Sequence, residues 1–124
     1  MKTSIVLTAL ACVLGFAGAS HAAQLASPTI YGAVTQTQAR CDVGNTSASN
    51  ANVKLSIVDE SGNVVSSGCG FVEAGFICSI FANNIGNGVA YACVANVTGS
   101  PKPIRASFTL WDANENVLRT ADLH

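Results

Sequence analysis

The sequence predicts an all-β protein whose strands form a two-sheet sandwich. Short segments that alternate apolar and polar residues recur along the chain, and turns rich in Gly, Asn, Asp and Ser separate them. No window has the 3.6-residue apolar period of an amphipathic helix. The first 22 residues have the pattern of an export signal, and four of the five cysteines follow it. An even number of cysteines in an exported chain indicates disulfides that stabilise a small domain.

The export signal has a positive start at Lys2, an apolar stretch over residues 5–19 and a small-x-small cleavage pattern ending at Ala22. The stretch is shorter than the roughly 20 apolar residues that span a membrane, and glycines interrupt it. A retained anchor, or a lipoprotein modified at Cys12, fits less well. We therefore expect cleavage after Ala22 and one mature domain over residues 23–124, secreted or periplasmic, in a bacterial product.

The alternation pattern places about seven strands in this domain. Strands are expected at residues 29–43 (one or two strands), 52–59, 64–66, 76–81, 89–97, 104–111 and 117–118. In the segment 52–59, Val53, Leu55 and Ile57 share one face, which predicts that this face is buried. Glu-Ser-Gly-Asn at residues 60–63 has turn chemistry and separates this strand from the next.

The later strands are bounded by equally clear turns. Gly75 precedes a strongly apolar segment that ends at Phe81. From Val89 to Val97 every second residue is apolar, which predicts a strand with one buried face. The segment Asp-Ala-Asn-Glu-Asn at residues 112–116 is a turn before the last short strand.

Charge and residue types exclude several functions for the mature chain. Five basic and seven acidic side chains give a net charge of −2 and no basic patch, so we expect no binding to nucleic acid. No later segment is long enough to span a bilayer. The mature chain has one histidine, the terminal His124, so no Ser-His-Asp or Cys-His set can be assembled without it. We therefore expect a protein that is not an enzyme and has no cofactor.

Two residue patterns are similar to metal sites but lack essential ligands. The cysteines lack the C-x₂₋₄-C spacing of a zinc site. Asp112, Asn114 and Asn116 alternate as in the start of a calcium loop. However, Val117 replaces the expected Gly, and Leu123 replaces the bidentate Glu. A strand-connecting turn, in which the Asp bonds the backbone of its own turn, is the better interpretation.

Residues 87–93, Asn-Gly-Val-Ala-Tyr-Ala-Cys, are similar to the start of the sixth strand of an immunoglobulin-like domain. In that family the Tyr forms a buried corner with nearby backbone, and the Cys pairs across the sandwich with a Cys on the second strand. From the cysteines alone, three pairings are open. The resemblance implies the pair Cys41–Cys93, which leaves Cys69–Cys78 as the second disulfide.

The sequence departs from the family pattern at two points. Asn87 replaces the usual Asp, and no Trp follows the first cystine residue at the expected distance. Leu55 or Ile57 would fill that position, since the single tryptophan is Trp111 near the end of a later strand.

The leading functional hypothesis is a non-catalytic binding or surface-interaction module. The immunoglobulin-like arrangement places the loops after the second and sixth strands at one end. Here they extend from Asn45 to Asn50 and over residues 98–103, where Lys102 lies between two prolines. Asn45, Asn50 and Lys102 are the candidate binding residues, for an extracellular or envelope protein or a glycan.

Other functions remain open at this point. An inhibitor of a secreted hydrolase could use the Cys69–Cys78 loop, which carries Phe71 and Val72, as a constrained wedge. A pilus-type structural subunit also uses an immunoglobulin-like fold. A small hydrolase has the least support.

Overall fold

A computed structural model describes residues 22–124 and contains eight β-strands, which confirms the all-β prediction. They are β1 (Ala22–Ala26), β2 (Gln36–Asn45), β3 (Ala51–Asp59), β4 (Val64–Val72), β5 (Ile77–Asn83), β6 (Tyr91–Thr98), β7 (Ile104–Asp112) and β8 (Val117–Asp122). Within these residues there is no helix long and apolar enough to cross a membrane. The predicted signal peptide, residues 1–22, lies outside the described residues except for Ala22, the first residue of β1.

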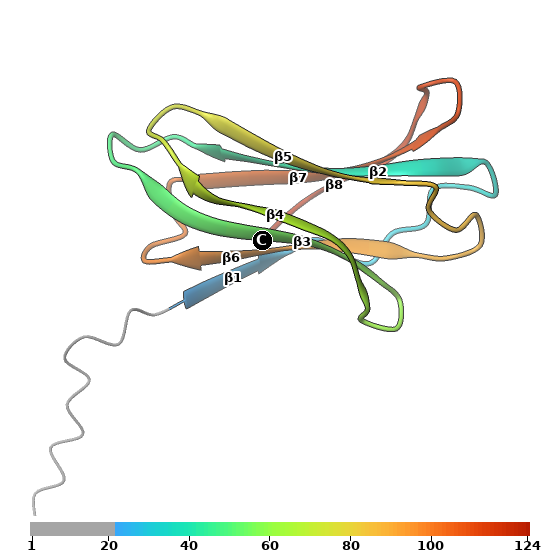
Figure 1. The fold of residues 1–124 in the computed structure, drawn as a ribbon, viewed down its shortest axis with the longest axis horizontal. Coiled ribbons are helices and arrows are strands. Elements are labelled where there is room, and N and C mark those ends of the chain that lie inside the picture. The colour runs from blue at the N-terminus through green and yellow to red at the C-terminus, as the bar shows by residue number, and fades with distance from the viewer. Residues whose placement is uncertain (1–21) are drawn as a thin grey trace, which may run out of the picture.

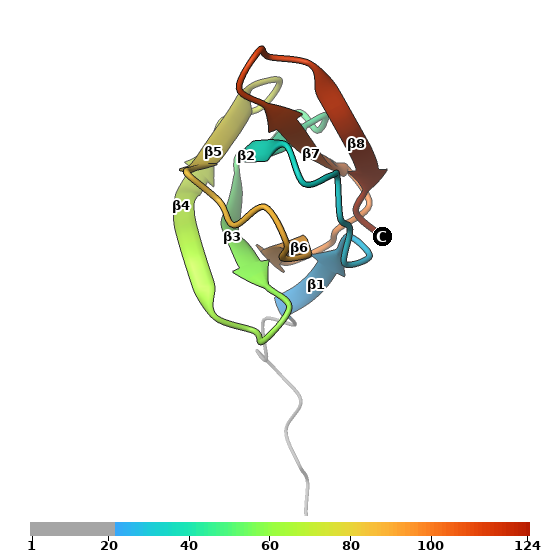
Figure 2. The same cartoon turned by 90° about the vertical axis from the view of Figure 1, so that its right-hand side faces the viewer.

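The strands form two four-stranded antiparallel sheets that face each other (Figures 1 and 2). One sheet has the order β1-β6-β3-β4 and the other the order β5-β2-β7-β8. The chain passes between the sheets at each of the connections β1–β2, β2–β3, β4–β5, β5–β6 and β6–β7. The predicted two-sheet sandwich is confirmed, with eight strands instead of about seven.

The order of the end strands differs from a constant-type immunoglobulin domain. In that arrangement the first strand shares a sheet with the second, and the last shares a sheet with the sixth. Here β1 pairs with β6, whereas β7 pairs with β2. The end strands have exchanged sheets, while the second and sixth strands keep the opposing positions that the resemblance implies.

The core lies between the inward faces of the two sheets, as the alternation pattern predicts. Val53, Leu55 and Ile57 of β3 are completely buried. On β6, the side chains of Tyr91, Cys93, Ala95 and Val97 are at most 5% exposed. The facing sheet contributes five further fully buried side chains: Ala39, Cys41, Val43, Phe108 and Leu110.

Two disulfides join the sheets, with the pairing that the resemblance implies. Cys41 of β2 pairs with Cys93 of β6 through the core, over a sequence separation of 52. Cys69 of β4 pairs with Cys78 of β5 at one side of the sandwich, over a separation of 9. Loop-closure entropy assigns about 4 kcal/mol to the first bridge and about 3 kcal/mol to the second. Two such bridges indicate an oxidising, non-cytosolic environment.

The opposite side of the sandwich is joined by main-chain hydrogen bonds. The N–H of Ala26 donates to the carbonyl of His124 at 3.1 Å, and the N–H of His124 donates back at 3.2 Å. The N–H of Leu123 donates to the carbonyl of Ala106 in β7 at 3.1 Å. The last two residues therefore connect β1 of one sheet with β7 of the other (Figure 2).

Candidate functional site

Three loops meet at one end of the sandwich. They connect β2 to β3 (residues 46–50), β4 to β5 (73–76) and β6 to β7 (99–103). Thr46 donates from its N–H and its hydroxyl to the carbonyl of Pro103, at 2.9 and 2.7 Å. The two loops expected to lie together are therefore in direct contact.

The side chain of Asn45, one of the three candidate binding residues, points into the protein and not toward solvent. It is 2% exposed, and its amide nitrogen donates to the carbonyls of Ser49 at 2.8 Å and Val72 at 3.0 Å. Its Oδ1 accepts from the N–H and the hydroxyl of Ser47. All the polar atoms of this side chain are engaged internally, so Asn45 holds the loop in shape and offers nothing to a ligand.

Asn45 also fixes the third loop, which the sequence analysis did not assign to this end. Its N–H donates to the carbonyl of Phe76 at 3.0 Å, and its carbonyl accepts from the N–H of Gly75 at 2.8 Å. Asn50 is exposed, but its Oδ1 accepts from the N–H of Ala74 at 3.1 Å. The three loops are thus linked to one another, which limits their independent motion.

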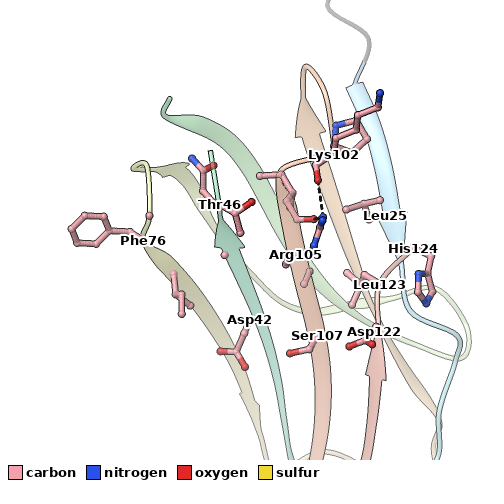
Figure 3. A pocket seen from close by; sticks show the side chains of 17 residues that line it. Leu25, Asp42, Thr46, Phe76, Lys102, Arg105, Ser107, Asp122, Leu123 and His124 are labelled. Atoms are coloured by element: carbon pink, nitrogen blue, oxygen red, sulfur yellow. Dashed lines mark hydrogen bonds between the residues drawn. The ribbon is translucent and has the colours of Figure 1, made fainter. Parts of the chain in front are cut away.

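A shallow cavity of about 890 Å³ opens beside these loops (Figure 3). It extends over the outer surface of the β5-β2-β7-β8 sheet to the junction with β1. Phe76 lies on one side of the cavity, and Leu25 and Leu123 lie on the other (Figure 3). Ile77, the next residue after Phe76, also lines it. The polar side chains along its floor are Asp42, Ser107 and Asp122. We call this cavity the loop-end groove.

Positive charge gathers where the groove meets the loops. Lys102 and Arg105 both line it and are exposed, and neither pairs with a carboxylate within residues 22–124. The guanidinium Nη1 of Arg105 donates to the carbonyls of Lys102 at 2.7 Å and Ile104 at 3.0 Å, which holds the charge at this rim. The anchored guanidinium of Arg105 and the exposed ammonium of Lys102, beside a floor with two carboxylates, can recognise a polar ligand of mixed charge.

One floor carboxylate is already engaged. Asp42 accepts from the Nε of Arg40 at 2.6 Å and from the hydroxyl of Ser79. The Arg40 guanidinium lies over the rings of Phe81 and Trp111, with its central carbon 5.5 and 5.6 Å from their centroids. This cross-strand network keeps the outer surface of the sheet ordered next to the groove.

The opposite end of the sandwich is closed by buried polar side chains. Tyr91 is 5% exposed, and its hydroxyl accepts from the N–H of Gly86 at 2.8 Å, as the resemblance implies. Gln36, 1% exposed, donates to the carbonyls of Gly86 and Val89, both at 2.6 Å, and accepts from the N–H of Gly32 at 2.9 Å. These bonds explain burial of polar groups without a ligand.

The calcium-like segment is a turn. Oδ1 of Asp112 accepts from the N–H groups of Asn114 and Asn116, both at 2.9 Å. The hydrogen bonds from Asn116 lower the pKa of the Asp112 carboxyl below 3.8, and those from Asn63 do the same for Asp59. In the described part of the chain, no group of three or more His, Cys, Asp or Glu residues could hold a metal ion.

No family model and no curated protein matches this sequence. Among solved structures, it is similar to the crystal structure of protein 1070 of Thermotoga maritima, with a TM-score of 0.48 and 16% identity. The match covers 83% of this chain and 93% of the other. A likeness at this level supports no inference about function.

Proposed function

We propose that this protein is a non-catalytic binding module that acts outside the cytoplasm, secreted or periplasmic, after removal of residues 1–22. Its binding site is the loop-end groove, and its partner is an extracellular or envelope protein or glycan. Two disulfides support a location in an oxidising compartment. The signal pattern at the start of the chain supports export.

The observation that carries this proposal is the set of three mutually bonded loops around a groove with two exposed cations. Loops on a rigid scaffold are where binding residues concentrate in many folds. Because Asn45 and Thr46 tie the loops together, a partner would meet a surface that is already ordered. Such preorganisation reduces the conformational entropy lost on binding.

The chemistry of the titratable groups favours binding over catalysis. The four cysteines after the signal are all in disulfides. His124 lines the groove with Ser107 and Asp122, but within residues 22–124 no ion pair joins its imidazole to a carboxylate. General acid–base catalysis requires a side chain that is held within hydrogen-bond reach of the group that it protonates or deprotonates.

Capture of partners by the immobilised, disulfide-bonded protein tests the proposal. The bait is exposed to the secreted and envelope fractions of its own organism, and retained proteins and glycans are identified. Lys102→Glu should abolish retention without changing the urea midpoint of unfolding. A Gly-Ser replacement of residues 46–50 should also abolish retention but lower that midpoint, because it removes the side-chain hydrogen bonds of Thr46 and Asn50. Arg119→Glu, the same charge reversal at an exposed position of β8, is the matched control. If Lys102→Glu and the loop replacement retain partners as well as the Arg119→Glu control does, the proposal is contradicted.

A second candidate function is inhibition of a secreted hydrolase. The favouring observation is the disulfide-closed turn between β4 and β5, on which Phe71 is 63% and Phe76 is 61% exposed. Val72, the other residue expected to contact an enzyme, is 2% exposed and belongs to the core. A panel of secreted proteases and glycosidases tests this function, because inhibition should be lost in Phe71→Ala and retained in Lys102→Glu. Nothing in the described residues specifically favours a pilus-type subunit.

A further inference from the structure

The exposed apolar side chains of this protein are concentrated at one place. Nine large hydrophobic residues are exposed within the described chain, and six of them belong to β4, β5 or the turn between these strands. The six are Val64 (59%), Val65 (45%), Phe71 (63%), Phe76 (61%), Ile77 (71%) and Phe81 (46%). We call them the seam strip.

The members of the strip lie along one edge of the sandwich, where β4 and β5 run side by side in opposite directions (Figures 1 and 2). Two contacts fix their alignment. The hydroxyl of Ser66 donates to the carbonyl of Phe81 at 2.7 Å, and Cys69 is bonded to Cys78. Phe71 and Phe76, each two residues from a cystine partner on the side of the turn, therefore lie on opposite sides of the seam near the turn.

The exposed area of the strip matches one half of a small dimer interface. At about 150 Å² per residue, the lower end of the range for aromatic side chains, the exposed fractions give roughly 500 Å² of largely apolar surface. This lies toward the upper end of the largest patches on typical monomers, at about 300–600 Å². Burying two such surfaces removes about 1,000 Å² from solvent, the least that a biological interface is expected to bury.

The charges around the strip are complementary to those of a second copy. Glu73 is exposed in the turn at one end of the strip. Arg40 lies beside Phe81, toward the other end; it is 36% exposed, so its guanidinium can meet a second carboxylate besides Asp42, with which it pairs. A two-fold axis across the strip would place the Glu73 end of one copy against the Arg40 end of the other. A membrane surface would instead require a cluster of cations around the apolar residues.

We propose that the seam strip is the interface of a symmetric homodimer. A closed two-fold contact buries the same patch on both copies and leaves no apolar strip for further growth. The small net charge of −2 after signal removal does not oppose association. Two members of the strip, Phe76 and Ile77, also line the loop-end groove, and the other four lie outside its lining. The inference is tested separately from the proposed binding function, because its readout is self-association and its variants lie outside the groove.

Sedimentation equilibrium of the disulfide-bonded protein over a wide concentration range tests the proposal. We expect a monomer–dimer equilibrium with a micromolar Kd. The double variant Phe71→Ser with Val65→Thr should raise that Kd at least tenfold. The matched control removes one exposed aromatic and one exposed valine elsewhere, Tyr31→Ser with Val117→Thr, and should leave it unchanged.

Three results would overturn the inference: a parent protein that is monomeric at millimolar concentration, a strip variant that dimerises as well as the parent, or a control that dissociates equally. A parent protein that stays monomeric but binds a different protein through the strip would also overturn the inference. If the strip variant has a lowered urea midpoint, its weaker dimer could result from a destabilised fold, and the variant Glu73→Arg is measured in its place. This change in an exposed turn must weaken the dimer, and an unchanged Kd rejects the two-fold arrangement.

Discussion

Removing the side chain of Asn45 should destabilise the protein far more than removing other loop asparagines. In Asn45→Ala the carbonyl of Val72 loses its donor in a buried position, while Ser49 and Ser47 lose partners closer to solvent. An orphaned buried acceptor costs about 1–3 kcal/mol, and each further net hydrogen bond contributes about 0.5–1.5 kcal/mol. Ser47 and Ser49 can recover part of their loss from water. The expected loss is therefore about 2–4 kcal/mol.

Urea unfolding of the disulfide-intact protein, followed by tryptophan fluorescence, measures this effect. Asn50→Ala is the control, since it removes one exposed hydrogen bond from the same loop and should cost less than about 1 kcal/mol. Asn45→Asp is a sharper variant. It keeps the acceptor for Ser47 but places a carboxylate oxygen against two carbonyls, so it should be at least as destabilising as Asn45→Ala at neutral pH.

The reasoning fails if Asn45→Ala and Asn50→Ala unfold at the same urea concentration. It also fails if Asn45→Asp is as stable as the parent at neutral pH. Either result would mean that the side chain of Asn45 is not held as described, and that it is available to a ligand after all.

Three further predictions concern other parts of the fold. Tyr91→Phe leaves the N–H of Gly86 without its acceptor and should lower the free energy of unfolding by about 1–3 kcal/mol, as measured in urea. Gln36→Ala orphans two carbonyls and one N–H and should exceed the effect of Tyr91→Phe; an equal or smaller loss contradicts its role. The folded-state pKa of Asp112 is lowered, so its contribution is complete above the ordinary value of 3.8 and is lost as the pH falls through the folded value. The difference in urea midpoint between the parent and Asp112→Asn should therefore be present at about pH 6 and shrink toward about pH 2, whereas a constant difference rejects this cause.

The core could be predicted because alternation of apolar residues along a strand is a local signal. Val53, Leu55 and Ile57 share a face in any extended strand, and the observed strand buries all three. Cys93 and Tyr91 share a face for the same reason. Successive side chains of a strand point to opposite faces, so alternating apolar residues define one apolar face whichever strands lie beside it.

The full length of β4 was not predictable from propensity. The prediction ended this strand at Ser66, whereas it continues to Val72 through a segment rich in Ser and Gly, which rarely favour strands. Cys69 and Gly70 have φ angles of 66° and 139°, so this backbone is irregular. It remains in the sheet because β3 pairs with it over the whole length.

The groove was only partly predictable. That the loops 46–50 and 99–103 meet follows from the sandwich order, and Lys102 is exposed at this end. The burial of Asn45 depends on Val72, which is 27 residues away, and no local pattern distinguishes this asparagine from Asn50. The burial of Gln36 likewise depends on carbonyls at least 50 residues away.

Amide hydrogen exchange with and without the captured partner tests the binding site most directly. Partner binding should slow exchange in residues 44–50, 73–76 and 99–105, which surround the loop-end groove. Exchange in residues 28–35 and 84–90, at the opposite end, should stay unchanged. Slowing confined to that opposite end, with the groove segments unaffected, would contradict the account.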